Sequence, residues 1–258
     1  MLKGFPKENL KLMLLSITQF LINWVLFLVD NADYFFHFAL SLYWNILTLG
    51  IFPSARSKPG LARSKDKKKN WVLVTGCSTG IGNAAALYLA AQEGVRVFAT
   101  VRSSMDEEWL TAKDPAGNVK PVLMDVTDER SVARAVRTIK DTLDLDGSRL
   151  IAVINNAGIS CPGIIELCRV DTIKSVMDVN LHGVVRVVQA FLPLLRGAKG
   201  DGGPARIINV SSVAGLFSTA VIGPYSASKY ALEAISDALS RELSAQNITV
   251  SIVEPGKL

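Results

Sequence analysis

The chain has 258 residues, a formal net charge of +5 at pH 7 and a hydrophobic content of 49%. This length accommodates one α/β domain with an appendage, and the apolar content is high for a soluble domain and indicates a membrane segment. The three cysteines, Cys77, Cys161 and Cys168, show neither a C-x-x-C pair nor metal-ligand spacing. The sequence therefore argues against a metal site and a disulfide framework, and favours reduced thiols in a domain facing the cytosol.

Residues 1–53 are predicted to form a hydrophobic membrane anchor of one or two helices. Residues 12–29 carry no charge, and this run is close to the ~20 residues that cross a bilayer. Asp30 and Asp33 interrupt it before a second apolar stretch over 34–53. Positive residues flank both stretches on the outside, which favours a hairpin with both ends in the cytosol. A cleaved signal peptide and a single span with an interfacial helix are the alternatives.

Residues 54–69 are predicted to form a basic linker with one acidic residue, Asp66. Its positive residues are Arg56, Lys58, Arg63, Lys65, Lys67, Lys68 and Lys69. Neither aromatic residues nor a nucleic-acid-binding motif accompany these charges. A solvated juxtamembrane linker is therefore favoured over a nucleic-acid-binding segment, and no nucleic-acid partner is expected.

From residue 70 onward, apolar runs that predict strands alternate with runs that predict helices. The predicted strands are 71–74, 95–101, 119–124, 150–154, 206–212 and 248–253. The predicted helices are 83–90, 131–143, about 171–196 and about 225–245. This order predicts an α/β domain over residues 70–258, built on a Rossmann-like doubly wound parallel sheet with right-handed crossovers. Ligands are then expected at the carboxyl ends of the strands.

The loop after the first predicted strand is rich in glycine and leads directly into a helix. In this setting the first glycine forms the turn, and the later ones let the backbone approach a pyrophosphate at the positive end of the helix. A turn that only connects a strand to a helix is the alternative. The predicted cofactor-binding residues of this turn are Gly76, Ser78, Thr79, Gly80, Ile81 and Gly82.

Arg102 stands at the end of the second predicted strand. NAD-binding units place an acidic residue there, against the ribose 2′-hydroxyl. An arginine instead suits a 2′-phosphate, through its charge and its planar donor fork, and Thr79 can add a hydrogen bond. The sequence therefore favours NADP(H) over NAD(H), with a merely solvated strand-end arginine as the alternative.

Tyr225 and Lys229 are four positions apart, so they share one face of the last predicted helix. A phenol with a pKa of about 10 is a poor base at neutral pH, and a nearby ammonium favours the phenolate. Such a tyrosine can give a proton to a carbonyl oxygen or take one from a hydroxyl. Ser212, at the end of the fifth predicted strand, can hydrogen-bond the same substrate oxygen.

Four motifs in a fixed order resemble the short-chain dehydrogenase/reductase family over nearly all of residues 70–256. They are T-G-x-x-x-G-I-G at 75–82, N-N-A-G at 155–158, Ser212, and Y-x-x-x-K at 225–229. The resemblance implies an oxidoreductase in which a nicotinamide cofactor carries the hydride.

The resemblance also implies the roles of individual residues. Tyr225 is the catalytic acid or base, and Lys229 holds the nicotinamide ribose and tunes Tyr225. Ser212 positions the substrate, with Ser211 as its neighbouring alternative, and Asn180 supports a water-mediated proton path. The further cofactor-binding positions are Asp125 and Val126 beside the adenine, Asn156, Ala157 and Gly158 facing the cofactor, and Pro255 and Gly256 near the nicotinamide. On the residues alone, Asp125 or Thr127 could cap the helix beginning near Asp128, a role that is compatible with contact to the adenine.

Within the family, the sequence resembles steroid, retinol or other lipid-alcohol dehydrogenases. The resemblance lies in the apolar amino-terminal residues, the strand 97–102 and P-Y-S-A-S-K at 224–229. We therefore expect an NADP(H)-dependent enzyme that interconverts a carbonyl and an alcohol on a steroid, a retinoid or a fatty-acid derivative. A 3-ketosphingoid or acylglycerone-phosphate reductase is an alternative within this class. The expected location is the endoplasmic reticulum or a lipid droplet, with the catalytic domain facing the cytosol, and a homo-oligomer is left open.

The sequence ends at Leu258, shortly after Pro255 and Gly256. Family members usually continue into a loop and helices that cover the substrate. The resemblance thus implies a domain over 70–258 that lacks this lid, with the sixth strand left as an exposed edge. The alternative function is accordingly a truncated, non-catalytic cofactor-binding or membrane-adaptor protein.

Overall fold

The computed structural model describes residues 70–197 and 205–256. The predicted anchor over residues 1–53 and the predicted linker over residues 54–69 lie outside the described residues. Within the described ranges, no helix combines the length and the apolar character needed to cross a bilayer.

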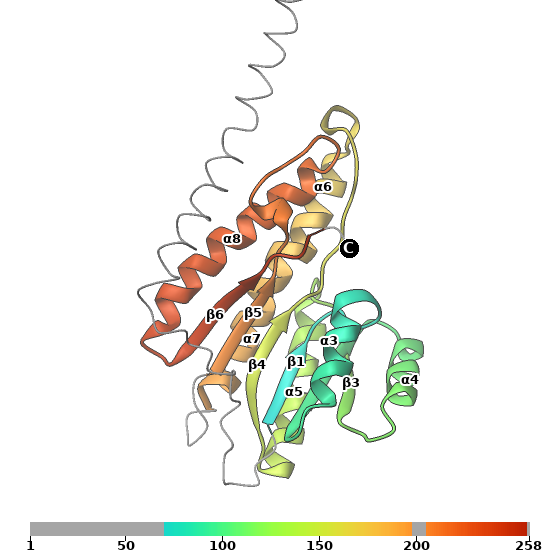
Figure 1. Cartoon of the computed structure of the whole chain (residues 1–258), viewed down its shortest axis with the longest axis vertical. Helices are drawn as coiled ribbons and strands as arrows, with labels where there is room; N and C mark the ends of the chain where they lie inside the picture. Colours follow the sequence, from blue (N-terminus) through green and yellow to red (C-terminus); the bar gives the residue numbers. More distant parts are fainter. Residues whose placement is uncertain (1–69, 198–204, 257–258) are drawn as a thin grey trace, which may run out of the picture. The chain divides into compact units, whose positions relative to one another are not determined.

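The described strands form one parallel sheet in the order β3-β2-β1-β4-β5-β6, which confirms the predicted Rossmann-like arrangement (Figure 1). The strands are β1 (Asn70–Val74), β2 (Val95–Val101), β3 (Val119–Leu123), β4 (Arg149–Asn155), β5 (Ala205–Val210) and β6 (Ile248–Val253). Ser211 and Ser212 follow the end of β5, although the sequence placed them within this strand. Among the described strands β6 pairs only with β5, so it forms an edge of the sheet.

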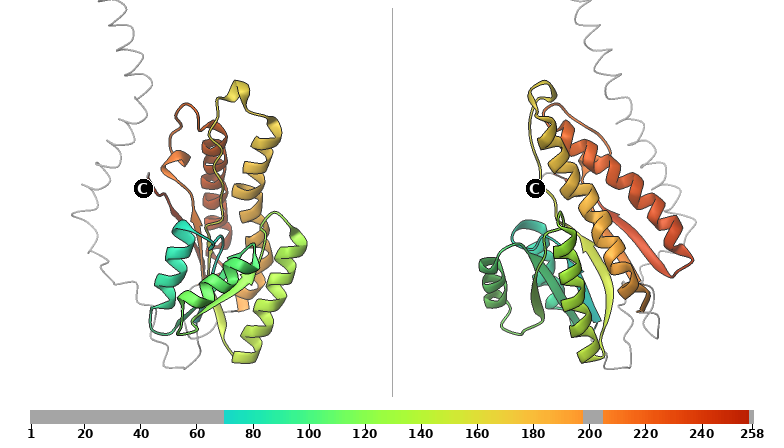
Figure 2. Two further views of the ribbon diagram at one scale, coloured as in Figure 1. Left: turned by 90° about the vertical axis from the view of Figure 1, so that its right-hand side faces the viewer. Right: turned by 180° about the vertical axis from the view of Figure 1, so that it is seen from behind.

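Helices cover both faces of this sheet. The α-helices are α3 (Gly80–Ala90), α4 (Ser104–Lys113), α5 (Glu129–Asp146), α6 (Val170–Met177), α7 (Gly183–Gly197) and α8 (Gly223–Ser244). A π-helical segment, Asp178–His182, joins α6 to α7 without a break. Helices α5, α7 and α8 pack on one face, and α3 and α4 pack on the other (Figures 1 and 2).

Strand β1 shows why the strands read as continuous apolar runs. Trp71 and Leu73 contribute to the core on the side of α5 and α7, where Trp71 stacks on Phe98 with ring centroids 4.0 Å apart. Val72 and Val74 contribute to the core on the side of α3. Successive side chains of a strand point to opposite faces, and here both faces are covered. Every residue from Trp71 to Val74 is therefore buried.

Helix α5 buries the apolar face that the sequence predicts, but its amino-terminal cap is a different residue from those predicted. Its buried residues recur at helical spacing, and its carboxyl end meets Gly147 in the left-handed conformation. The cap is Asp128, whose carboxylate accepts a hydrogen bond from the Arg130 N–H. The prediction that Asp125 or Thr127 caps this helix is therefore wrong. The two side chains bond to each other instead, with the Thr127 N–H and hydroxyl both donating to Asp125 Oδ1.

Helix α4 has no counterpart among the predicted helices. It buries only Leu110, so it lacks the apolar stripe that identifies a surface helix in a sequence. Its first turn is held by Ser103, whose hydroxyl accepts a hydrogen bond from the Asp106 N–H.

Candidate active site

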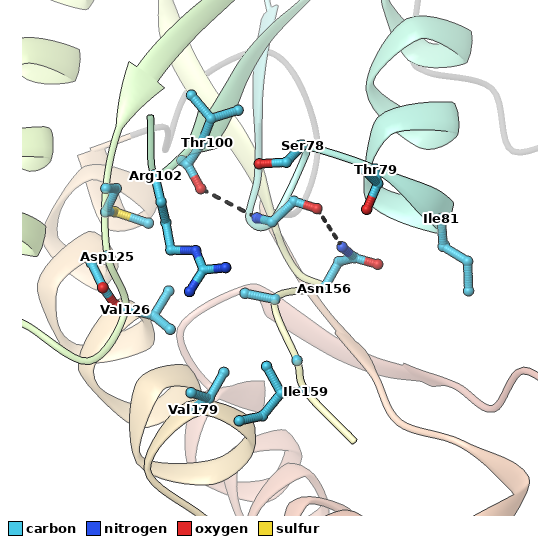
Figure 3. Close-up of a pocket in the computed structure, with 15 residues that line it drawn as sticks. Ser78, Thr79, Ile81, Thr100, Arg102, Asp125, Val126, Asn156, Ile159 and Val179 are labelled. Atoms are coloured by element: carbon cyan, nitrogen blue, oxygen red, sulfur yellow. Dashed lines mark hydrogen bonds between the residues drawn. The ribbon is translucent and has the colours of Figure 1, made fainter. Parts of the chain in front are cut away.

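A pocket of about 300 Å³ lies at the carboxyl ends of the strands, between the glycine turn and the segments that follow β2, β3 and β4 (Figure 3). The predicted cofactor residues that line it are Gly76, Ser78, Thr79, Ile81, Arg102, Asp125, Val126, Asn156, Ala157 and Gly158. This is the edge at which doubly wound sheets bind their ligands. The structure thus brings together residues from four separate segments of the sequence.

The glycine turn is held against the N-N-A-G segment by hydrogen bonds to main-chain atoms. The Asn156 amide donates to the carbonyl oxygen of Thr75 at 2.9 Å. It also donates to that of Gly76 at 3.1 Å (Figure 3). The Thr75 hydroxyl accepts from the N–H groups of Asn156 and Ala157, both at 3.0 Å. The turn is therefore fixed before any ligand binds, which lowers the ordering cost of binding.

Two of the glycines are required by the geometry of the turn. Gly76 has φ +70°, a conformation that residues with a Cβ rarely adopt. A Cβ on Gly82 would lie 2.3 Å from the Asn156 amide nitrogen and 2.4 Å from the Gly76 carbonyl oxygen. Gly82 is therefore needed for the close approach of helix α3 to the turn, as the third glycine of dinucleotide-binding loops is.

The amino end of α3 suits an anion. Thr79 caps it without a side-chain hydrogen bond to the helix, and the first turn contains no acidic residue. The first N–H groups of a helix lack partners within the helix and lie at its positive end. The turn, this helix end and the adjoining pocket therefore fit the pyrophosphate of a dinucleotide.

Arg102 and Asp125 form the charged part of the pocket. The Arg102 side chain extends into it and lies near Asp125 and Val126 (Figure 3). Burial raises the pKa of Asp125, but hydrogen bonds from Thr127 and the Arg102 charge outweigh it and leave this pKa below its usual value. Asp125 is therefore ionised at neutral pH.

Lys229 is the most unusual charged group of the site. Its side chain is only 4% exposed, and Nζ donates to the Val210 carbonyl oxygen at 2.8 Å. Nζ also lies 5.7 Å from the centre of the Tyr225 ring. Burial lowers the pKa of Lys229 to about 8, against an opposing effect of Glu233. The ammonium form is thus kept at neutral pH, close to the phenol, at the cost of desolvation.

Ser212 and the segment after β6 meet just beyond Val210, the residue whose carbonyl oxygen accepts the hydrogen bond from Lys229. The Ser212 hydroxyl donates to the Pro255 carbonyl oxygen at 3.4 Å and accepts from the Ala214 N–H at 3.2 Å. Tyr225, Lys229, Pro255 and Gly256 do not line the 300 Å³ pocket. The two regions adjoin at Gly158, because a Cβ there would lie 3.8 Å from Lys229 Nζ.

Asn180 lies in the π-helical segment and is fully buried. Its amide nitrogen donates to the Ile159 carbonyl at 2.9 Å and to the Ser228 hydroxyl at 3.0 Å, and its oxygen accepts from the Ile159 N–H at 2.8 Å. The π-helical segment is a local irregularity in the helix at this polar residue. Both amide hydrogens are engaged, so the side chain itself secures the loop after β4 to α8.

Some pocket residues carry no motif of their own. Thr100, Val101, Met124, Ile159 and Val179 line the pocket without having been predicted. Thr100 was detectable, because it is a polar residue in an apolar strand, and its hydroxyl accepts from the Gly76 N–H at 3.3 Å. Among the described residues, no group of acidic, histidine and cysteine side chains is arranged to hold a metal ion.

Comparison with known proteins agrees with this geometry. Residues 70–258 match the family model described as short chain dehydrogenase. Retinol dehydrogenase 7 of Rattus norvegicus is 37% identical over 219 residues, covering 84% of this chain and 63% of the relative. The mitochondrial D-beta-hydroxybutyrate dehydrogenase of Bos taurus is 37% identical over 188 residues, which cover 72% of this chain and 53% of the relative. The chain thus spans a little over half to under two thirds of the length of these relatives.

Solved structures show the same fold. The RhlG/NADP active-site complex of Pseudomonas aeruginosa superposes with a TM-score of 0.66 at 32% identity, covering 74% of this chain and 73% of that one. The NADPH-bound carbonyl reductase from chicken fatty liver gives a TM-score of 0.65 at 30% identity, covering 73% and 79%. The first of these structures is a complex with NADP and the second contains bound NADPH.

Proposed function

Because the chain belongs to the short-chain dehydrogenase family, we propose that it is a membrane-anchored NADP(H)-dependent oxidoreductase that interconverts a carbonyl and an alcohol on a lipid-like substrate. The observation that carries this proposal is the buried Lys229 ammonium beside the Tyr225 ring. Burying a lysine without a paired carboxylate is costly, and such groups are concentrated at functional sites.

The nicotinamide cofactor supplies or accepts the hydride, and the residues of this chain move the proton. The Lys229 ammonium stabilises a negative charge on the Tyr225 oxygen. Tyr225 then protonates a carbonyl oxygen during reduction or removes the hydroxyl proton during oxidation. The Ser212 hydroxyl, on turning away from the Pro255 carbonyl oxygen to which it donates at 3.4 Å, donates to the same substrate oxygen and orients it. The proposed cofactor-binding residues are those of the glycine turn, the pocket and the Pro255–Gly256 segment.

The proposed lipid-like substrate is supported by an apolar rim, which we define as the exposed residues Ile164, Ile165, Leu167, Leu216, Phe217 and Val221. The two segments that carry it lie together, because the Gly163 N–H donates to the Val221 carbonyl at 2.6 Å. The second segment follows Ser212 directly. Exposed apolar groups of this kind mark binding surfaces for apolar partners. The name of the retinol dehydrogenase relative is consistent with this class, and that of the hydroxybutyrate dehydrogenase offers a small hydroxy acid as the competing substrate.

A turnover assay of the full chain in detergent micelles tests the proposal. All-trans-retinol, a 3-hydroxysteroid and 3-hydroxybutyrate are each offered with NADP⁺ and NAD⁺, and the reduced cofactor is followed. We expect turnover of retinol or the steroid, and a fall of about 100-fold or more in kcat for Tyr225→Phe with unchanged cofactor affinity. Turnover of 3-hydroxybutyrate alone would refute the lipid substrate. If wild type and variant bind the cofactor equally and neither turns over, the chain is a cofactor-binding protein and not an enzyme.

A further inference from the structure

A carboxylate lies at the side of the glycine turn, where the sequence motifs assign nothing. Asp106, in the first turn of α4, accepts hydrogen bonds at Oδ2 from the Ser78 hydroxyl at 2.9 Å and from the Ser103 hydroxyl at 2.8 Å. Ser78 belongs to the glycine turn and lines the pocket, and Ser103 directly follows Arg102. The carboxylate is therefore fixed where the glycine turn meets the end of β2.

This junction is where a dinucleotide places the 2′ position of its adenosine ribose. That position lies next to the residue at the end of the second strand, which is Arg102 in this chain. Arg102 acts electrostatically on Asp125 and extends into the pocket beside it (Figure 3). Two opposite charges thus lie near this junction. Arg102 lines the pocket, and Asp106 does not line it but is hydrogen-bonded to Ser78, which does.

The directions of the hydrogen bonds decide which ribose this edge prefers. The single hydroxyl hydrogen of Ser78 is donated to Asp106, so in this arrangement Ser78 presents only acceptor lone pairs to a ligand. Lone pairs and a nearby carboxylate favour a ribose 2′-hydroxyl, which donates. They disfavour a 2′-phosphate, which is anionic and accepts.

We propose that Asp106 is a specificity-determining residue that opposes Arg102, so that the site accepts NAD(H) as well as NADP(H). The inference rests on the proposed function, because it concerns the same cofactor. Arg102 attracts the 2′-phosphate, and Asp106 with Ser78 limits that advantage. The preference for NADP(H) over NAD(H) is then smaller than it would be if Arg102 acted without Asp106.

Asp106→Asn tests this inference, because it removes the charge and keeps the size of the side chain and the backbone N–H that Ser103 caps. The full chain in detergent micelles is titrated with NADPH and with NADH at constant ionic strength, following nicotinamide fluorescence. We expect the Kd for NADPH to fall about tenfold and the Kd for NADH to rise about twofold. Asp106→Ser, which retains a short polar side chain, gives the same test if the asparagine variant does not fold.

Glu108→Gln is the matched control, because it removes a negative charge from an exposed position of the same helix. It should leave the ratio of the two dissociation constants unchanged. The proposed role of Asp106 would be refuted if Asp106→Asn left the ratio of the dissociation constants for NADPH and NADH unchanged, or if Glu108→Gln changed it equally. Neither result would affect the proposed function. A wild-type chain that binds neither cofactor would overturn the proposed function and this inference with it.

Discussion

Lys229 couples the stability of the cofactor-free protein to pH. Its pKa is about 8 in the folded protein and 10.5 in an unfolded chain. Between these values the unfolded chain holds one more proton than the folded one, so stability rises as the pH rises. The difference corresponds to about 3 kcal/mol, because each pKa unit is worth about 1.4 kcal/mol. Below pH 8 both states are protonated and the full cost of burying the charge is present.

The measurement is urea unfolding of wild type and Lys229→Met between pH 7 and pH 10. We expect the free energy of unfolding of wild type to increase relative to that of the variant by about 2–3 kcal/mol over this interval, which stops short of the unfolded pKa. Subtracting the variant removes the contributions of other titrating groups. Parallel curves for the two proteins would show that Lys229 keeps an ordinary pKa in its buried position.

Local spacing explains which site residues the sequence could reveal. The turn glycines lie within one loop, and Tyr225 and Lys229 lie one helical turn apart, so a single segment shows each group. The contact between Ser78 and Asp106 joins residues separated by the whole of β2. No periodic pattern records such a contact, and it becomes visible only when the sheet brings the glycine turn next to α4.

At the scale of elements, a chain of buried hydrogen bonds ties β4, β5 and α8 together. The Asn155 amide donates to Asn209 Oδ1 at 2.8 Å, the Asn209 amide donates to the Ser236 hydroxyl at 2.8 Å, and Ser236 donates to the Leu232 carbonyl at 2.6 Å. Asn155, Asn209 and Ser236 are at most 2% exposed. These hydrogen bonds fix α8, the helix that contains Tyr225 and Lys229, to the centre of the sheet.

Asn209→Ala should therefore be strongly destabilising. It leaves a buried donor on Asn155 and a buried acceptor on Ser236 unpaired, and each unpaired group costs about 1–3 kcal/mol. We expect Asn209→Ala to lower the free energy of unfolding, measured in urea, by about 2–4 kcal/mol. Ser236→Ala should lower it by about half as much, because it leaves only the Asn209 amide without its partner. If Asn209→Ala lowered the free energy of unfolding by less than Ser236→Ala does, the hydrogen bonds described for Asn209 would be contradicted.

The same scale explains which elements the sequence could reveal. Strands β1 and β2 are buried along almost their whole length and leave apolar runs, and α5 leaves a stripe, so the sequence revealed these elements. The predicted fifth strand extended two residues beyond the end of β5. Helix α4 buries one leucine and leaves neither pattern. The cap of α5 was assigned wrongly because Asp125, Thr127 and Asp128 are all suitable capping side chains. The structure identifies Asp128 as the cap through its extended backbone, with φ −109° and ψ 110°, and the hydrogen bond that its carboxylate accepts from the Arg130 N–H.

At the scale of the whole molecule, we propose that residues 1–53 anchor the chain with the catalytic domain facing the cytosol. The support is the uncharged run 12–29, the apolar stretch 34–53 and the positive residues outside both. An anchor would keep the domain at the membrane in which a lipid-like substrate is dissolved. The apolar rim could also bind a membrane by itself. Membrane binding through residues 1–53 therefore has to be distinguished from binding through the rim.

Sodium carbonate washing of membranes from cells that express the chain separates them. An integral protein stays in the pellet under this treatment, whereas a protein bound through surface contacts is released. We expect the full chain to remain in the pellet and a variant lacking residues 1–53 to be released or never to sediment, because the apolar rim offers only surface contacts. Protease added to intact vesicles with the cytosolic side outward should digest the domain over residues 70–258. Release of the full chain by carbonate would refute the anchor, and protection of the domain from protease would refute its orientation.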